Sequence, residues 1–185
     1  MIERVDIENG KIYEVRNFPT VKEQSDFWYM ANECEYSYGQ QSDSLMSQRQ
    51  GRMVHRIDVN VFVRTEFWNK IEKYVNCPIG LSDAYINYAD SSTLTFPHCD
   101  NRENEMSILL CLNQDWHRNW GGYTSFFSGV ADNNIIKTVV PEPGKAIFFN
   151  GSIYHVALPP NNIAEYPRFM LALKLLWLEP KKEIK

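Results

Sequence analysis

The sequence predicts a mainly β protein with flanking helices, in which a double-stranded β-helix (jelly roll) barrel is buttressed by N-terminal helices. Three observations support this fold class: short β-rich runs punctuated by turn residues fill the chain from Leu81 onward, no long helix interrupts them, and the helix signals gather before them. The length of 185 residues fits one domain with a substantial core. We therefore expect a single domain over residues 1–185, with helical support and an N-terminal hairpin in 1–80 and the jelly-roll core in 81–178.

The beginning of the chain carries a hairpin signal and a helix signal. Two β-rich runs, residues 2–6 and 11–15, flank the Glu-Asn-Gly turn of residues 8–10, which is typical of a β-hairpin. Thr20 and Glu23 then form a capping-box pattern, which indicates the start of a helix. Apolar residues follow at helical spacings of four, three and four, at Phe27, Ala31, Cys34 and Tyr38.

A polar segment separates this helix from a second one. The first helix is expected to end near Gly39, and residues 40–52 are rich in Ser and Gln, as in a loop that folds over a pocket. The second helix is expected to stop at the Asn-Cys-Pro sequence of residues 76–78. Its apolar positions are Phe67, Trp68, Ile71, Tyr74 and Val75.

Eight strands are predicted in the rest of the chain, with turn sequences rich in Gly, Pro, Asn and Asp between them. Their ranges are 84–88, 94–100, 106–112, 123–127, 135–140, 146–149, 153–158 and 169–178. A jelly roll places its second and seventh strands side by side, so residues 94–100 and 153–158 are expected to be neighbours.

The candidate metal ligands are two residues of the second strand and one of the seventh. His98 and Asp100 stand two positions apart on an extended segment, so their side chains leave the same face while Cys99 points the other way. His155 follows 55 residues after Asp100. Two imidazoles and one carboxylate on one face of a metal, with its other positions open, are typical of non-haem Fe(II) oxygenases. The other histidines, His55 and His117, do not belong to such a set of candidate ligands and are not expected to bind a metal.

The net charge and the cysteine content indicate which partners the protein binds and in which cellular compartment it works. The net charge of −4 argues against a dominant nucleic-acid face, although Arg49, Arg52 and Arg56 gather in one short region. The four cysteines show neither metal-ligand spacing nor the density of a disulfide scaffold. No run approaches the roughly 20 apolar residues of a membrane span, and the N-terminus has no signal-peptide pattern. These features predict a cytoplasmic protein that does not enter a membrane.

Several motifs in order resemble the Fe(II)- and 2-oxoglutarate-dependent dioxygenases, and within them the prolyl 4-hydroxylase-like group. The resemblance covers roughly residues 81–177 and, more vaguely, the N-terminal helices. It rests on Tyr88 ten residues before His98, the His98-Cys99-Asp100-Asn101 sequence, the apolar run 108–113, Trp120-Gly121-Gly122, Pro143-Gly144-Lys145-Ala146, His155 and Arg168.

The resemblance implies roles for these residues. His98, Asp100 and His155 would bind Fe(II) and form the catalytic centre, and Arg168 would pair with the distal carboxylate of 2-oxoglutarate. A guanidinium offers a planar fork that matches a carboxylate, which supports the choice of an arginine. Lys174 shares the strand parity of Arg168 and is the alternative anchor.

Three further positions near the co-substrate follow from the same resemblance. Tyr88 stands where the family often directs a phenol to 2-oxoglutarate, with Tyr85 as the competing phenol. Thr124 would add a hydroxyl inside the barrel. The family usually has Glu directly after the Gly-Gly pair, whereas this sequence has Tyr123, so the surroundings of the site and the substrate differ from the family pattern.

The implied reaction is hydroxylation of an unactivated C–H bond with dioxygen and 2-oxoglutarate as co-substrates, Fe(II) as the metal and ascorbate as a reductant. Asp100 is retained where related halogenases carry a small residue, which favours hydroxylation. A prolyl or other amino-acid residue in a peptide or protein is the expected substrate, with small molecules also open. The alternatives are a nucleobase-demethylating dioxygenase, a Zn(II) hydrolase on the same ligands and a non-catalytic jelly-roll binding module.

Overall fold

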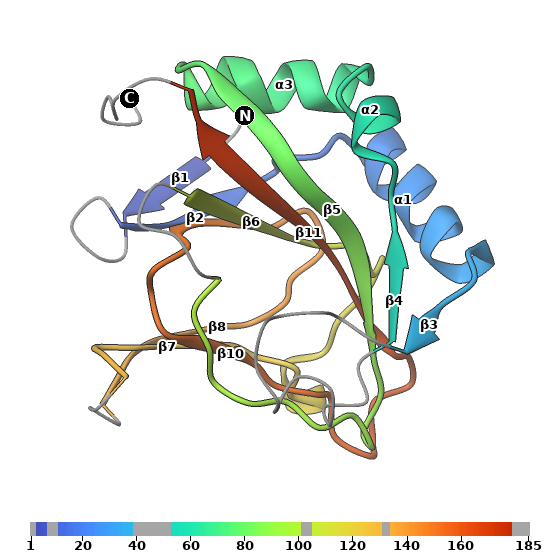
Figure 1. Cartoon of the computed structure of the whole chain (residues 1–185). Helices are drawn as coiled ribbons and strands as arrows, with labels where there is room; N and C mark the ends of the chain where they lie inside the picture. Colours follow the sequence, from blue (N-terminus) through green and yellow to red (C-terminus); the bar gives the residue numbers. More distant parts are fainter. Residues whose placement is uncertain (1–2, 7–10, 39–52, 101–104, 131–133, 179–185) are drawn as a thin grey trace.

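The computed structural model describes residues 3–6, 11–38, 53–100, 105–130 and 134–178 (Figure 1). Strands dominate this part of the chain, and three α-helices lie in its first half. In order, the elements are β1 (Glu3–Asp6), β2 (Ile12–Arg16), α1 (Val21–Glu33), β3 (Ser37–Tyr38), β4 (Met53–Arg56), α2 (Val59–Phe62), α3 (Glu66–Val75), β5 (Ile79–Ala89), β6 (Glu105–Cys111), the 3-10 helix η2 (Arg118–Trp120), β7 (Thr124–Phe127), β8 (Ile135–Val139), β9 (Ala146–Asn150), β10 (His155–Ala157) and β11 (Arg168–Trp177).

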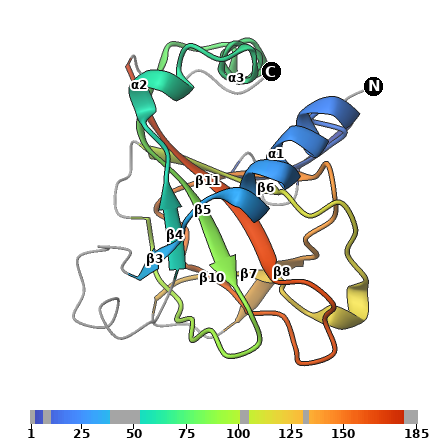
Figure 2. The same cartoon turned by 90° about the vertical axis from the view of Figure 1, so that its right-hand side faces the viewer.

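The strands form two antiparallel sheets. The larger sheet has the order β1-β2-β9-β6-β11-β5-β4-β3, and the smaller has the order β10-β7-β8. Figure 1 shows the small sheet facing one side of the large sheet, and Figures 1 and 2 show α1 and α3 on the opposite side. This confirms the expected jelly-roll-like class with buttressing helices. The strand pairing of the described residues leaves two separate sheets rather than one closed barrel.

Strand β11 lies near the middle of the large sheet and separates two hydrophobic clusters. Its odd-numbered residues face the helices, and its even-numbered residues face the small sheet, because side chains alternate along a strand. The helix-side cluster contains Phe169, Leu171, Leu173 and Leu175 from β11. The inner cluster, between the two sheets, contains Met170 and Ala172 from β11 together with Leu109, Phe126, Ile147 and Phe149. Each even-numbered position of β11 therefore points into the space between the sheets.

The predicted elements form where expected in most of the chain. The hairpin β1–β2 pairs antiparallel, the capping box of Thr20 and Glu23 starts α1, and α3 ends at Asn76 in the left-handed conformation. Seven of the eight predicted strands are present within the described residues. The expected loop over residues 40–52 lies outside the described residues. None of the described helices is long and apolar enough to cross a membrane.

Two expectations about element boundaries are wrong. The segment 94–100 is not a strand, since only His98 in it makes a bridge, to His155. Pro97 in this segment has no N–H to donate to a ladder, which accounts for the missing pairing. Helix α1 ends at Glu33 instead of near Gly39, because the chain becomes extended at Cys34 and β3 then pairs with β4. Tertiary pairing overrides the helical periodicity there.

Glu23 connects the first helix to the third. Its carboxylate accepts a hydrogen bond from the backbone N–H of Thr20 at 2.6 Å and one from the Lys70 ammonium at 2.9 Å. Burial raises the pKa of Glu23, but the hydrogen bonds from Lys70 and Thr20 outweigh it and hold the pKa below its ordinary value of 4.5. The folded state thus favours the ionised form.

We predict that Glu23→Ala lowers the free energy of unfolding by about 1 kcal/mol near neutral pH, because it removes a cap and a partly exposed ion pair. Urea denaturation would measure the loss. The stabilisation is present above pH 4.5 and disappears as the pH falls through the folded-state pKa, so the two proteins should converge in acid. Lys22→Ala, which removes a fully exposed pair with Asp26, is the control and should unfold like the wild type. A difference that persists at low pH would contradict the role of the carboxylate.

Candidate metal centre

Backbone pairing brings the three candidate ligands together. The N–H of His98 donates to the carbonyl of His155 and the N–H of His155 donates to the carbonyl of His98, both at 2.9 Å. The N–H of Asp100 donates to the carbonyl of Gly151 at 2.8 Å. Between the two ligands, the thiol of Cys99 contacts the carbonyl of Ser152. The expected neighbourhood of the two segments is therefore confirmed, although only one of them is a strand.

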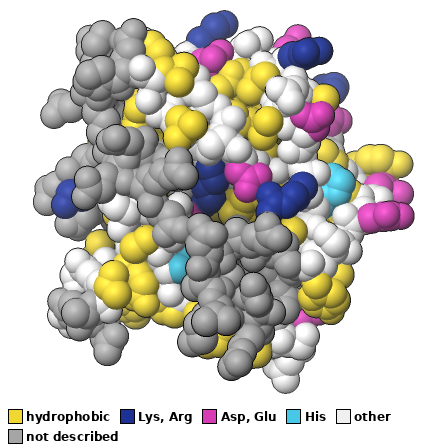
Figure 3. Space-filling model, viewed as in Figure 1, with side chains coloured by type: hydrophobic (Ala, Val, Ile, Leu, Met, Phe, Trp, Pro, Cys, Tyr) yellow, Lys and Arg dark blue, Asp and Glu magenta, His cyan; other side chains and the backbone are white. Residues whose placement is uncertain are grey.

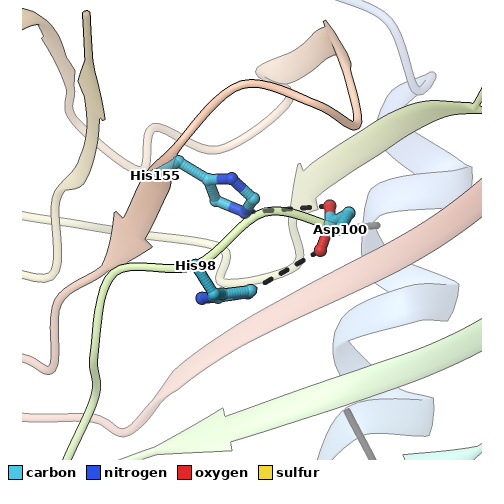
Figure 4. A group of neighbouring side chains, drawn as sticks. All are labelled: His98, Asp100 and His155. Atoms are coloured by element: carbon cyan, nitrogen blue, oxygen red, sulfur yellow. Dashed lines mark ion pairs between the residues drawn. The ribbon is translucent and has the colours of Figure 1, made fainter. Parts of the chain in front are cut away.

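The donor atoms of the three side chains lie around one point, and both imidazoles turn toward the carboxylate (Figure 4). Nε2 of His98 is 3.7 Å from Oδ1 of Asp100, and Nε2 of His155 is 3.7 Å from Oδ2. The three ligand atoms all lie within 4.8 Å of one another. Donors at about 2.1 Å from one ion and at right angles stand about 3 Å apart, so small adjustments bring these three onto a single metal.

Hydrogen bonds fix the proton of each imidazole away from the centre. Nδ1 of His98 lies 3.0 Å from the carbonyl of Phe96, and Nδ1 of His155 lies 2.8 Å from the carbonyl of Ile153. A carbonyl can only accept, so Nδ1 carries a proton in each ring and Nε2 is the nitrogen that faces the centre. This is the tautomer that a metal requires, and the donor set of the site fits a divalent ion.

Asp100 is held as a carboxylate by the large sheet. Its Oδ2 accepts a hydrogen bond from Oγ of Ser107 at 2.5 Å and contacts the ammonium of Lys174. Burial alone would raise the pKa of Asp100, but the Lys174 charge and the hydrogen bonds outweigh burial and hold the pKa well below its ordinary value. Ser107 and Lys174 face each other in the pairing of β6 with β11.

Arg168 lies at the far end of the same inner face. It opens β11, is 2% exposed, and donates from Nη2 to Oγ1 of Thr124 at 3.0 Å. In the small sheet Thr124 pairs with Ala157, and Phe126 pairs with His155. The guanidinium is therefore bound two residues along the small sheet from His155, a strand rise of about 7 Å. The inner cluster contains Met170 and Phe126, so apolar side chains flank both the guanidinium and the candidate metal ligands.

Gly122 packs directly under Arg168. It has φ +72°, and a Cβ placed there would lie 2.7 Å from the Trp116 ring and 3.1 Å from Cδ of Arg168. The Trp116 indole in turn donates to the carbonyl of Gly121 at 3.1 Å. Only glycine allows both the backbone conformation and the close approach. The Gly-Gly turn is thus a support for the arginine side chain.

Several sequence-predicted residues lie elsewhere. Tyr88 faces the helices, where its ring packs against Tyr36 and Phe169, so the structure does not bring it to the site. The reason is strand parity, since β5 directs Tyr85 toward the inner cluster and Tyr88 to the opposite face. Tyr123 directs its hydroxyl to the carbonyl of Arg118 at 2.5 Å, in the loop before β7. The substitution at this position therefore leaves the inner face of the sheet unchanged.

The remaining histidines, His55 and His117, make contacts away from this centre. Nδ1 of His55 bonds to the carbonyl of Glu35, and His117 caps η2 by accepting from the N–H of Asn119. Lys174, the alternative anchor, contacts Asp100 instead of sharing the pocket end with Arg168.

Sequence reasoning missed the contact of Ser107 and Lys174 with Asp100. The available signal was polarity, because each is a polar residue with an apolar residue on either side of it in its strand. A polar side chain in a buried strand requires a partner, but the register that pairs these two residues emerges only from the sheet.

Residues 84–175 match the family described as the 2OG-Fe(II) oxygenase superfamily. The chain belongs to this superfamily. The match confirms the resemblance seen in the sequence, and it identifies the protein as a 2-oxoglutarate-dependent dioxygenase with a centre suited to Fe(II). No curated protein sequence matches the chain.

Solved structures share the fold at low sequence identity. A Pseudomonas putida prolyl-4-hydroxylase superposes with a TM-score of 0.63 and 15% identity, covering 91% of this chain and 94% of its own. A Trichoplax adhaerens prolyl hydroxylase, in complex with a hypoxia inducible factor peptide fragment, has a TM-score of 0.67 and 16% identity. The match covers 91% of this chain and 84% of that one. HygX from Streptomyces hygroscopicus, with nickel and 2-oxoglutarate bound, has a TM-score of 0.64 and 11% identity. The match covers 91% of this chain and 83% of that one.

We predict that the chain binds one divalent ion through the three ligands. His98→Ala should weaken Mn(II) binding by at least about 100-fold, since loss of a ligand exceeds the effect of losing a supporting contact. Titration followed by the electron paramagnetic resonance of free Mn(II) measures this. His55→Ala is the matched control, and equal weakening by both variants would contradict the assignment.

Proposed function

We propose that this oxygenase uses Fe(II), dioxygen and 2-oxoglutarate to hydroxylate an unactivated C–H bond of a prolyl or other amino-acid residue in a peptide or protein. The single observation that carries the proposal is the inner face of the two sheets, which has a His-Asp-His donor set at one end and a buried guanidinium at the other. The spacing of about 7 Å along the strands fits a short dicarboxylate between them.

His98, Asp100 and His155 would hold the iron. The bound ion and its co-substrate supply the oxidising power, which no protein side chain provides. The protein fixes the two imidazole tautomers through the carbonyls of Phe96 and Ile153, and it keeps Asp100 ionised. These contacts would present three donor atoms to an ion bound there, and such a donor set leaves positions for other ligands.

Arg168 and Thr124 would bind the distal carboxylate of 2-oxoglutarate. The Arg168 guanidinium provides a planar set of donors, and the Thr124 hydroxyl accepts from Arg168 while its own proton remains available to a ligand oxygen. Phe126 and Met170 of the inner cluster line the space between the sheets and exclude water from it. A carboxylate in this place would meet a buried positive charge, which favours its binding.

The substrate would approach from the side of His98. The His98 side chain is 23% exposed, whereas those of His155 and Asp100 are 4% and 5% exposed. Water and solutes can thus reach the centre past His98 and are excluded on the side of the sheets.

A peptide substrate is supported by the two prolyl hydroxylases among the structural neighbours, one of which was solved with a peptide fragment. The surface also favours peptide over nucleic acid. On the face shown in Figure 3, the basic and acidic side chains of the described residues are interspersed rather than collected into a stripe of one sign. A surface that binds the phosphate backbone of a nucleic acid requires clustered Lys and Arg side chains.

The experiment that tests the function incubates the protein with Fe(II), ascorbate, 2-oxoglutarate and a library of proline-containing peptides. Succinate release and a peptide mass gain of one oxygen atom are the expected results. Arg168→Ala should raise the KM for 2-oxoglutarate by roughly 10- to 100-fold, the equivalent of one charge-assisted hydrogen bond. Arg56→Ala, which removes a half-exposed arginine paired with Asp83, should leave that KM unchanged. If succinate forms while every peptide stays unmodified, the proposal of a peptide substrate is wrong. If no succinate forms under any condition, the proposal that the protein is an active oxygenase is wrong.

Gly122 supplies a second test of the pocket. We predict that Gly122→Ala raises the KM for 2-oxoglutarate, because the added methyl group displaces Trp116 and the stem of Arg168. Gly129→Ala is the control, since a Cβ there meets nothing within 4 Å. Initial rates at varied 2-oxoglutarate concentration measure the effect, and equal KM values for the two variants would show that Arg168 does not depend on the turn.

A further inference from the structure

We propose that Lys174 is a positioning residue that, together with Ser107, makes Asp100 bind the metal through one oxygen only. The inference rests on the proposed function in one respect, namely that Asp100 is a metal ligand. It extends that function to residues of the large sheet that touch neither metal nor substrate. The carboxylate geometry would then be set by the protein before any ion arrives.

The two oxygens of Asp100 have different surroundings. Oδ2 receives the Ser107 hydroxyl at 2.5 Å and the Lys174 ammonium, and the ammonium also lies 3.2 Å from Oγ of Ser107. These contacts form a closed triangle. A carboxylate oxygen offers about two lone-pair sites, so two donors fill the capacity of Oδ2. Each imidazole faces one oxygen, since Nε2 of His98 lies 3.7 Å from Oδ1 and Nε2 of His155 lies 3.7 Å from Oδ2. Oδ1 accepts neither of the hydrogen bonds from Ser107 and Lys174, so it is the oxygen left for a metal.

The sheet fixes the position of both donors. Ser107 and Lys174 are paired residues of β6 and β11, and both side chains point into the space between the sheets. The Lys174 side chain is 12% exposed. Its ammonium lies between Oδ2 of Asp100 and Oγ of Ser107. A buried ammonium without its carboxylate would be costly, which makes the pairing persistent.

Binding through one oxygen matters for the coordination positions that remain open. Two imidazoles and a carboxylate oxygen occupy one face of the ion and leave the opposite face for exchangeable ligands. If Asp100 turned to offer both oxygens, it would take one of these positions. The hydrogen bonds from Lys174 and Ser107 oppose that turn, and they leave Oδ1 directed toward His98.

The chain offers a matched control in Lys145. Its side chain is 4% exposed, and its ammonium lies 3.3 Å from Glu14 and 3.0 Å from Glu142. Lys145 is thus a second buried lysine with carboxylate partners, but neither partner belongs to the metal centre. A variant at this position reports the general cost of removing a buried ammonium.

The test is a titration of the metal-free protein with Co(II), in which visible absorption reports both affinity and coordination. Lys174→Met should weaken Co(II) binding by about 10- to 100-fold, as expected for loss of a supporting contact. It should also change the shape of the absorption bands, because the carboxylate can then use both oxygens. Lys174→Arg should restore part of the affinity, and Lys145→Met should bind Co(II) with wild-type affinity and spectrum.

The outcomes separate this inference from the proposed function. If His98→Ala binds Co(II) as tightly as the wild type, the ligand assignment itself is wrong. If His98→Ala loses binding while Lys174→Met keeps wild-type affinity and spectrum, only the role of Lys174 is overturned. Far-UV circular dichroism checks folding. If Lys174→Met does not fold, Ser107→Ala takes its place, since it opens Oδ2 without removing a charge, and an unchanged Co(II) spectrum in that variant overturns the proposal.

Discussion

The metal centre depends on the pair of backbone hydrogen bonds between His98 and His155. These bonds join a segment that makes no other ladder contact to the first residue of β10, and they set the two imidazoles on the same side. Without them, His98 and Asp100 would belong to a segment with no fixed register. The bond from Asp100 to Gly151 adds a further main-chain contact between the same two parts of the chain, shifted by two residues from the register of the bridge. The geometry of the site is therefore a matter of main-chain pairing, and the side chains follow from it.

Strand β11 organises everything behind the centre. Because its side chains alternate, the residues that pack against the helices and the residues that reach the site are different sets. The apolar odd positions stabilise the fold, and the even positions place Arg168 at one end and Lys174 at the other. A slip of one residue in the register would exchange the two sets and destroy both the core and the site.

The sequence predicted the fold class well, because strand and turn signals are local. It also selected three residues whose ligand atoms the structure brings within 4.8 Å of one another, because the His-x-Asp spacing has a direct geometric meaning. It predicted less where tertiary pairing decides. The end of α1 depends on the pairing of β3 with β4. The segment before Asp100 contains Pro97 and pairs only at the His98 bridge, so it does not form the predicted strand. Tyr88 was misplaced because spacing in sequence does not reveal the face of a strand, which only the packing of β5 determines. The contacts of Ser107 with Lys174 required the register of two sheet neighbours.

The ion pair between Lys174 and Asp100 affects the order in which the protein folds and binds its metal. Many small metalloproteins cannot fold until the ion neutralises a cluster of repelling ligands. Here the buried anion already has its counter-charge in Lys174 of β11. Such a chain can complete its folding during synthesis and acquire iron afterwards, and a chelator would empty it without unfolding it. Iron supply would then regulate its activity and leave its abundance untouched.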